Sequence, residues 1–337
     1  MSRRALVTGG CGFIGSNLVK ELINQGWTVD VVDNMSNGDI ELIKGVRDLR
    51  VLPNASFLHA YKQQEAERTN DKILVIEDDF CSLGMLMHIN DENYDVVFHQ
   101  AAVPRVSYSV ENPAETTHEN ISKTVALFEA CIGAVDRVVF ASSSSVYGGA
   151  DTLPTKETQE KSPKSPYAWQ KSAIEDFSQI VSGLYDLDVV CLRYFNVFGP
   201  GQYGDSPYST AVSAWCHAAK NGTPCRSDGD GTQSRDLCYV DNVVNANILA
   251  ANADVTFDGK CYNIACGDRT TNNEILEYFK KNFDVEINDA PWRPGDIMHT
   301  QADITAAKED LGYEPTVRFW EGLEKTIEWW GIGEESE

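Results

Sequence analysis

The feature that most constrains the fold is residues 4–33, where an apolar run leads into a glycine turn and then into an amphipathic pattern. "RALVTGG" has the composition of a short buried strand, and "FIGSNLVKELINQG" repeats its apolar residues at helical spacing and ends at Gly26, a plausible C-cap. "TVDVVDN" is a second apolar strand that contains Asp33. This order, within about 30 residues, predicts a βαβ unit.

The apolar strand pattern recurs along the chain. "KILVIED", "DVVFHQAA", "RVVFASS" and "DVVCLRYFN" each resemble buried strands, and helical patterns separate them, notably at residues 120–133 and 167–184. Such alternation predicts an α/β fold, a doubly wound parallel sheet of the Rossmann type. After Asn196 a Gly/Pro loop and mixed short elements predict a smaller mixed α/β C-terminal domain. We expect residues 1–196, with a returning segment at about 239–265, to form the first domain, and residues 197–238 and 266–337 the second.

Composition narrows the choice of partner and compartment. Lysine and arginine total 28 against 51 acids, a formal charge of −23, which argues against nucleic acid or an anionic membrane surface as the main partner. The nine cysteines are an odd number without a CxxC pair, so we expect neither a disulfide framework nor a metal site. The sequence has no apolar run long enough for a membrane span and no secretory signal, and we expect a cytoplasmic protein.

The glycine turn predicts a nucleotide site. Gly9, Gly12 and Gly15 have G-x-x-G-x-x-G spacing between strand and helix, which lets a pyrophosphate approach the backbone N–H groups. An acid at Asp33 can accept hydrogen bonds from ribose hydroxyls and would repel a 2′-phosphate, so NAD is favoured over NADP. Asp79 and Phe80 follow the next strand, at the sheet edge where ligands bind. The alternatives are a helix-capping turn and an ordinary charged loop.

A tyrosine and a lysine in "YAWQK" predict proton-transfer chemistry. Tyr167 and Lys171 are four residues apart and therefore lie on one face of a helix. A lysine and a cationic nicotinamide ring would favour the phenolate, and lowering the tyrosine pKa by about three units requires roughly 4 kcal/mol. The alternative is a solvated pair, because this spacing is common on helices.

Four motifs in order, "TGGCGFIG", "ASSSSVYG", "YAWQK" and "LRYFNVFGP", resemble the extended short-chain dehydrogenase/reductase superfamily, specifically its nucleotide-sugar epimerases. "GDGTQSRDLCYVDNV" and "RPGD" extend the resemblance over nearly the whole chain, and the UDP-N-acetylglucosamine 4-epimerases are the group most resembled. The resemblance implies that the first domain binds NAD and the second a UDP-sugar, without a metal. It also implies a role in nucleotide-sugar metabolism and polysaccharide biosynthesis.

The resemblance implies a role for each matched residue. Tyr167 corresponds to the general base on the sugar 4-hydroxyl, Lys171 to its pKa tuner and ribose ligand, and Ser143 to the serine that hydrogen-bonds the reacting oxygen. The implied NAD contacts are Gly9, Gly12, Phe13, Ile14, Gly15, Asp33, Asn34, Ser36, Asn37, Gly38, Asp79, Phe80, Gln100, Ala101, Ala102, Tyr167, Lys171 and Tyr194. The implied substrate contacts are Ser143, Ser144, Ser145, Tyr167, Asn196, Thr210, Ala211, Arg235, Arg293, Asp296 and Thr300.

Two further residue types bear on the reaction and the sugar. Related 4,6-dehydratases and decarboxylases carry an acid near Ser144 or Ser145. Elimination of water across carbons 5 and 6 of the sugar needs a proton transfer there, and a serine hydroxyl cannot readily carry that proton. One of these serines could also simply end a strand. Thr300 matches a position that is tyrosine in galactose-type epimerases, so a smaller residue leaves room for an N-acetyl group. The loop with Tyr208, Ser209 and Thr210 also resembles the N-acetyl-accepting type.

We therefore expect interconversion of UDP-GlcNAc and UDP-GalNAc through a 4-keto sugar, with UDP-Glc/UDP-Gal as an additional pair. A UDP-uronic acid 4-epimerase is the nearer alternative, because Arg105 could meet a carboxylate, although Ser107 stands where such enzymes tend to carry arginine. The more distant alternatives are a nucleotide-sugar dehydratase, a decarboxylase and a non-catalytic NAD-binding protein. Helices at 120–133 and 167–184 are apolar beyond one stripe, and in the resembled family they pair with their copies, so we expect a homodimer.

Overall fold

The computed structural model describes residues 2–58, 72–92, 94–149, 152–205, 210–283, 285–292 and 297–333. The chain forms two compact units, neither of which is one continuous stretch. Unit 1 consists of Met1–Ser143, Ser165–Arg193 and Val244–Cys261. Unit 2 consists of Ser144–Lys164, Tyr194–Val243 and Tyr262–Glu337.

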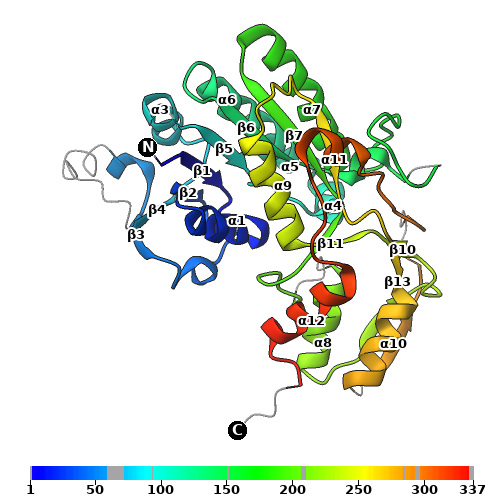
Figure 1. Ribbon diagram of the computed structural model, residues 1–337. Helices are drawn as coiled ribbons and strands as arrows, with labels where there is room; N and C mark the ends of the chain where they lie inside the picture. The colour runs from blue at the N-terminus through cyan, green and yellow to red at the C-terminus, as the bar shows by residue number, and fades with distance from the viewer. Residues whose placement is uncertain are drawn as a thin grey trace. The chain divides into compact units, whose positions relative to one another are not determined.

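The main sheet has eight strands in the order β12-β7-β6-β5-β1-β2-β4-β3 (Figure 1). Every pairing of this sheet whose register is described is parallel. The order runs outward in both directions from β1, as in a doubly wound fold, so the predicted fold class is confirmed. The bounds are β1 Arg4–Thr8, β2 Thr28–Asp33, β3 Asp48–Leu52, β4 Lys72–Glu77, β5 Val96–His99, β6 Arg137–Ser143, β7 Asp188–Tyr194 and β12 Cys261–Ile264.

Apolar strands buried on both faces explain why helices cover this sheet. One buried cluster joins strand residues such as Leu6, Val97 and Phe140 to the inner sides of three helices, α3, α6 and α7. The helix α1 contacts β1 and β2, and Val31 of β2 lies so close to Gly10 that a Cβ atom at Gly10 would be 2.7 Å from a Val31 methyl group. The helices of unit 1 are α1 Phe13–Asn24, α3 Leu83–Glu92, α4 Val106–Glu111, α5 Pro113–Thr117, α6 Lys123–Cys131 and α7 Pro166–Tyr185, with short turns η1 Ile40–Ile43 and η2 Ala55–Phe57.

Two local features shape the helices near the site. A π-helical turn, η3 (His118–Ser122), joins α5 to α6, so the apolar pattern at 120–133 begins in a turn wider than an α-helix. The helix α7 begins with Ser165, whose hydroxyl accepts a hydrogen bond from the Ala168 N–H, and with Pro166 at its first position. This start places Tyr167 in the first turn.

Unit 2 contains two-stranded sheets and helices of its own. The strand β8 (Asn196–Phe198) pairs with β11 (Leu237–Tyr239), β9 (Cys225–Asp228) with β14 (Ile287–Ala290), and β10 (Ser234–Arg235) with β13 (Thr270–Thr271). Buried aromatic residues such as Phe198, Trp215, Phe279 and Tyr313 form its core. The helices are η4 Ser144–Tyr147, α8 Ala211–Lys220, α10 Asn272–Phe283, α11 Thr305–Leu311 and α12 Phe319–Trp330, and α9 Val240–Asn252 begins in unit 2 and ends in unit 1.

Within the described ranges, none of the helices has the length and apolar character needed to cross a membrane. The same ranges contain no cluster of three or more histidine, cysteine or acidic side chains placed to hold a metal ion.

Candidate active site

The glycine turn between β1 and α1 is closed so tightly that side chains cannot enter it. A Cβ atom at Gly15 would lie 2.1 Å from the Gly9 carbonyl oxygen, and one at Gly9 would lie 2.8 Å from the Ala101 nitrogen. Gly9 also has a φ of +68°, which favours glycine. The turn therefore presents a backbone surface without side chains at Gly9, Gly12 and Gly15, at the start of α1.

That surface suits an anionic group. Gly12 is the N-cap of α1 and supplies no capping side chain, and the first turn, with Phe13 and Ile14, carries no acid. The first N–H groups of a helix have no partner within the helix and carry the positive end of its dipole. These donors fit the pyrophosphate of a dinucleotide.

Asp33 is held at the end of β2 with its carboxylate in place. Oδ2 accepts the Cys11 N–H at 3.0 Å and Oδ1 accepts the Met35 N–H at 2.9 Å. Burial raises the pKa of Asp33, and these two hydrogen bonds oppose the rise. Gly38 passes so close that a Cβ there would lie 2.7 Å from Oδ1. A carboxylate so placed fits a ribose diol, and Asn34, Ser36 and Asn37 lie in the loop between Asp33 and Gly38.

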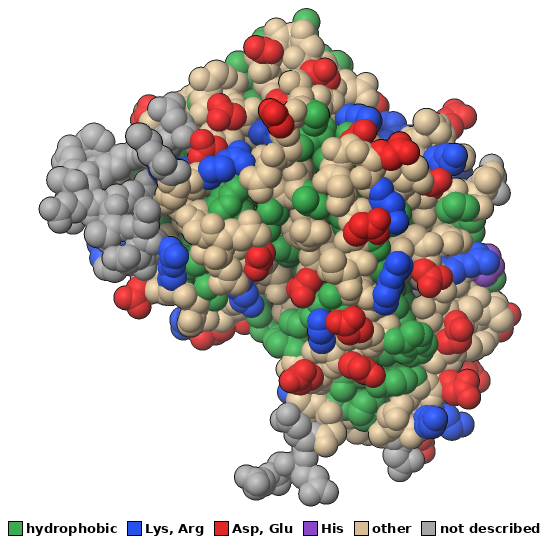
Figure 2. Space-filling view, viewed as in Figure 1, with side chains coloured by type: hydrophobic (Ala, Val, Ile, Leu, Met, Phe, Trp, Pro, Cys, Tyr) green, Lys and Arg blue, Asp and Glu red, His purple; other side chains and the backbone are tan. Residues whose placement is uncertain are grey.

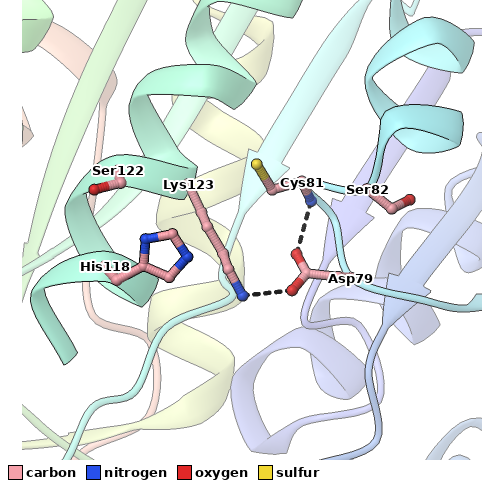
Figure 3. Close-up of a pocket in the computed structure, with 6 residues that line it drawn as sticks. All are labelled: Asp79, Cys81, Ser82, His118, Ser122 and Lys123. Carbon is pink, nitrogen blue, oxygen red and sulfur yellow. Dashed lines mark hydrogen bonds and ion pairs between the residues drawn. The ribbon is translucent and has the colours of Figure 1, made fainter. Parts of the chain in front are cut away.

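Asp79 and Phe80 follow β4, and Asp79 borders a pocket of about 290 Å³ (Figure 3). Its side chains come from the loop after β4 (Asp79, Cys81, Ser82), from η3 (His118, Ser122) and from α6 (Lys123). Lys123 donates to Asp79 and to Glu119, and these acids raise the Lys123 pKa against the effect of burial. The Cys81 N–H donates to Asp79 Oδ1 at 2.8 Å. The Asp79 carboxylate is therefore fixed in direction.

Gln100, Ala101 and Ala102 follow β5, next to β1 in the sheet. A buried histidine holds this stretch: His99 hydrogen-bonds Thr8 Oγ1 at 2.7 Å and Thr124 Oγ1 at 2.9 Å, and Thr8 Oγ1 accepts the Ala101 N–H. Burial lowers the pKa of His99 to about 3, so the ring is neutral. It acts as a fixed support, and the sequence pattern did not single it out.

Ser143, Tyr167 and Lys171 come together in unit 1. Ser143 ends β6 and forms a hydrogen bond with Tyr167, while the Lys171 ammonium donates to the Ala141 carbonyl at 2.7 Å. The Lys171 Nζ lies 5.9 Å from the centre of the Tyr167 ring. The Tyr167 N–H also donates to Ser109 Oγ, which anchors the first turn of α7.

The pKa of Tyr167 differs from the value expected on sequence grounds. Burial raises the pKa of Tyr167 to about 12, and the hydrogen bond with Ser143 lowers this pKa against the effect of burial. Burial lowers the pKa of Lys171 to about 8, and the nearby Glu175 opposes that fall. The expected lowering by Lys171 is therefore not present in the protein alone, because the ammonium is directed to Ala141 and desolvation dominates.

An ion pair behind the serine motif was not predicted. Glu175 is one further turn along the Tyr167–Lys171 face of α7, it is fully buried, and its carboxylate accepts the Ser142 hydroxyl at 2.6 Å. Arg193 binds both of its oxygens at 2.8 Å. The four-residue spacing could have indicated Glu175, but its partners come from two other strands, which no local pattern links.

A second unpredicted network holds α7 to the π-helical turn. The Gln170 side chain accepts from Asn120 at 2.8 Å and donates to the Thr116 and Thr117 hydroxyls. Asn120 in turn exchanges hydrogen bonds with the backbone of Val103. This network connects the helix that carries Tyr167 to the chain directly after Ala102.

The described substrate-site predictions other than Ser143 and Tyr167 lie in unit 2, as does Tyr194. Ser144 and Ser145 form the first turn of η4, and Tyr194 ends β7 as a buried residue. Thr210 is the N-cap of α8 and Ala211 its first residue; the Thr210 hydroxyl bonds Gln202 at 2.9 Å. Arg293 and Asp296, with Tyr208 and Ser209, lie outside the described residues.

Asn196, Arg235 and Thr300 lie on neighbouring strands and loops of unit 2. Asn196 begins β8 and pairs in register with Leu237, while Arg235 ends β10. The Thr300 N–H donates to the Ser234 carbonyl, and its hydroxyl accepts from the Asp236 N–H at 3.1 Å. The Thr300 hydroxyl also lies 3.5 Å from Asn196 Oδ1. Local backbone pairing therefore brings the three residues together.

Known proteins resemble this chain over nearly its full length. It is 33% identical to the UDP-glucose 4-epimerase of Mycolicibacterium smegmatis, covering 96% of this chain and 97% of that protein. It is 29% identical to the UDP-N-acetyl-α-D-glucosaminuronate decarboxylase of Bacillus cytotoxicus, covering 98% of both. The solved UDP-N-acetylglucosamine 4-epimerase of Methanobrevibacter ruminantium, in complex with UDP-N-acetylmuramic acid, is similar with a TM-score of 0.85, 34% identity and coverage of 97% and 98%.

The family model for NAD dependent epimerases and dehydratases matches residues 5–265. This range contains the glycine turn, Asp33 and the Ser143–Tyr167–Lys171 group. The geometry of these parts fits NAD. The chain therefore belongs to the NAD-dependent epimerase/dehydratase family, and its cofactor is NAD.

Proposed function

We propose that this protein is a 4-epimerase that interconverts UDP-GlcNAc and UDP-GalNAc. The observation that carries the proposal is the joint placement of Ser143, Tyr167 and Lys171 in the unit that holds the nucleotide turn. The relatives named as UDP-sugar 4-epimerases support the reaction class.

The protein's groups would move a proton at the sugar 4-oxygen. NAD, when bound, supplies the reversible oxidation of carbon 4. Tyr167 would accept the 4-hydroxyl proton as the 4-keto sugar forms. It would return this proton after the sugar has rotated in the site, so no net proton or electron is consumed. Ser143, already bonded to Tyr167, would hold the reacting oxygen. Lys171 is held by the Ala141 carbonyl, so its charge would favour the tyrosinate only together with the positive charge that bound NAD adds to the site.

Thr300 supports an N-acetylated sugar. Its backbone and hydroxyl are both engaged within unit 2, so its small side chain keeps a fixed place. A small residue there would leave room for the acetamido group on carbon 2. Pockets discriminate weakly against a smaller ligand, so UDP-Glc/UDP-Gal conversion is part of the proposal.

The uronic acid alternative is less well supported. Arg105, the cation considered for a sugar carboxylate, donates to Asn37 Oδ1 at 2.9 Å, in the loop that follows Asp33. Its guanidinium is therefore directed to the predicted cofactor loop. Ser107, in the helix α4 that follows Arg105, offers a hydroxyl and no charge.

One relative is a UDP-sugar decarboxylase, so decarboxylation is a second reaction class to compare with epimerisation. Ser144 and Ser145, at positions where dehydratases and decarboxylases were expected to carry an acid, begin η4 as hydroxyl residues. A hydroxyl is a poor carrier for the additional proton of an elimination. This chemistry favours epimerisation, in which only carbon 4 is oxidised and reduced.

We further propose a homodimer located in a reducing cytoplasm. Trp169, Ile180 and Leu184 are exposed along one side of α7, and Val106 and Val110 on α4 are also exposed. All nine cysteines are free thiols, as a reducing compartment would keep them. On the face in Figure 2, acidic and basic side chains are interspersed and no continuous basic area covers the described residues, which supports a small-molecule partner.

The deciding experiment is proton NMR of the anomeric region after incubation with UDP-GlcNAc, UDP-Glc or UDP-GlcNAcA, without added NAD. We expect UDP-GalNAc from UDP-GlcNAc, at least a hundredfold slower formation with Tyr167→Phe, and normal formation with Tyr185→Phe, an exposed tyrosine at the end of the same helix. Conversion of UDP-Glc alone would overturn the Thr300 argument. A product without an epimer would overturn the epimerase proposal.

A further inference from the structure

Asp236 is a buried carboxylate that no step of the proposed reaction uses. Its side chain is fully buried in unit 2, in the segment between β10 and β11. Such a charge requires several hydrogen-bond donors to be tolerated. Here the donors are all backbone N–H groups, so the carboxylate fixes the backbone conformation of the segments that carry these donors.

The three donors come from two loops. Asp236 Oδ1 accepts the Cys266 N–H at 2.9 Å, and Oδ2 accepts the Gly267 N–H at 3.1 Å and the Ala302 N–H at 3.0 Å. One carboxylate therefore ties residues 266–267 and residue 302 to the strand segment on which it lies. Both oxygens are required, because an amide side chain in the same place would direct an N–H group at a backbone N–H.

The same residue is next to two proposed substrate ligands. Arg235 directly precedes it, and the Asp236 N–H donates to the Thr300 hydroxyl at 3.1 Å. Thr300 is two residues from Ala302, whose N–H the carboxylate holds. Arg235 Nη1 donates to the carbonyls of Ser234 and Met298, so its guanidinium also depends on the course of the 298–302 segment.

We propose that Asp236 is the positioning residue of the UDP-sugar site: its ionised carboxylate fixes Arg235 and the 300–302 segment for the diphosphate and the sugar, and its protonation weakens substrate binding. The inference rests on the proposed function, because that function makes Arg235 and Thr300 substrate ligands. A protonated carboxyl cannot accept three N–H bonds as a carboxylate does, so one loop would be released.

The titration of Asp236 falls near neutrality. Burial raises its pKa to about 7, and the three backbone hydrogen bonds oppose the rise. Since an acid binds its proton below its pKa, binding of a UDP-sugar should weaken as the pH falls through about 7. The other titratable or charged groups around this segment are Arg235, Asp268 and Arg318, the thiols of Cys238 and Cys266, the phenol of Tyr313, and His299, which bonds Ser234.

The test is calorimetric titration of the NAD-loaded Tyr167→Phe protein with UDP-GlcNAc, which this variant should convert at least a hundredfold more slowly than the parent. UDP-GlcNAc is preferred to UDP because its diphosphate has no terminal phosphate that titrates near pH 7. We expect Asp236→Asn to raise the Kd at least tenfold at pH 8. It should leave the NAD content unchanged, because the proposed NAD residues other than Tyr194 belong to unit 1. Asp230→Asn, an exposed aspartate of unit 2 that bonds Thr232, is the matched control and should leave the Kd unchanged.

The pH series keeps the inference falsifiable if Asp236→Asn does not fold. In the Asp236-containing protein, the Kd should rise at least threefold from pH 8 to pH 6, and a flat profile would overturn the proposal. A pH dependence that persists in Asp236→Asn would also overturn it. If UDP-GlcNAc does not bind the parent protein at any pH, the proposed function itself fails; binding that Asp236→Asn leaves intact refutes only the role of Asp236.

With Tyr167 restored, the variant should raise KM at least tenfold and change kcat less than threefold. A general loss of structure would lower kcat and NAD content together. A lowered kcat at unchanged KM would contradict a positioning role in substrate binding.

Discussion

Ser143 and Tyr167 show how a single hydrogen bond can set the working pH of a site. Burial raises the pKa of Tyr167, and the bond with Ser143 lowers it. Ser143→Ala should therefore raise that pKa further and move the ascending limb of the pH–rate profile, on which the base loses its proton, to higher pH. We expect kcat at pH 7 to fall at least tenfold, with partial recovery by pH 9. Initial rates from pH 6 to pH 10 test this, and an unshifted profile of reduced height would contradict it.

Gly15 permits a second test at the scale of one atom. A methyl group there would lie 2.1 Å from the Gly9 carbonyl, so Gly15→Ala must distort the turn. We expect the purified variant to retain less than a tenth of the NAD of the parent, measured from the absorbance of the released cofactor. Gly183→Ala, within α7 and with nothing within 4 Å of the new Cβ, should keep its NAD. Full occupancy in Gly15→Ala would contradict the proposed cofactor position.

Single residues were predictable from sequence where the chemistry depends on local spacing. Asp33 at a strand end and Tyr167 with Lys171 on one helix face are of this kind, and their placement in unit 1 agrees with the fold class that the strand pattern predicted. Glu175, Arg193 and Ser142 meet from three separate elements. The Tyr167 pKa could not be predicted, because it depends on burial, and burial is a property of the whole unit.

At the scale of elements, the amide network of Gln170 holds α7 against the π-helical turn. Gln170→Ala would leave the Asn120 amide and the hydroxyls of Thr116 and Thr117 without this partner. A buried polar group that loses its partner costs about 1–3 kcal/mol. We expect Tm to fall by several degrees and kcat to fall more than the NAD content. Gln179→Ala, exposed on the same helix, is the control, and equal effects of the two variants would contradict the network's role.

The π-helical turn could not be predicted from the sequence pattern. Residues 120–133 repeat their apolar side chains at helical spacing, yet the helix begins with the wider turn His118–Ser122. That turn directs the Asn120 amide to Val103 and Gln170. Periodicity detects which side of a helix is buried, but one extra residue in a turn changes the apolar pattern too little to be seen.

At the scale of the whole molecule, the proposed dimer predicts that α7 has a partner surface. Ile180 and Leu184 are 54% and 70% exposed on one side of this helix. Leu184→Glu should convert a dimer into a monomer at micromolar concentration, measured by light scattering after gel filtration, because a charge would replace a contact with its symmetry mate. Met87→Glu, on the exposed side of α3, should leave the mass unchanged. A monomeric parent protein would contradict the dimer proposal.

The path of the chain through the two units has a consequence for synthesis. The chain passes between them five times, at residues 143/144, 164/165, 193/194, 243/244 and 261/262. During synthesis on a ribosome, unit 1 therefore remains incomplete until Cys261 has been added to the chain. A chain interrupted at residue 200 would carry Tyr167 and Lys171 but lack the last segment of that unit, and it should be recognised by proteases as incomplete. Neither unit can be produced alone by placing a stop or a start codon at one boundary.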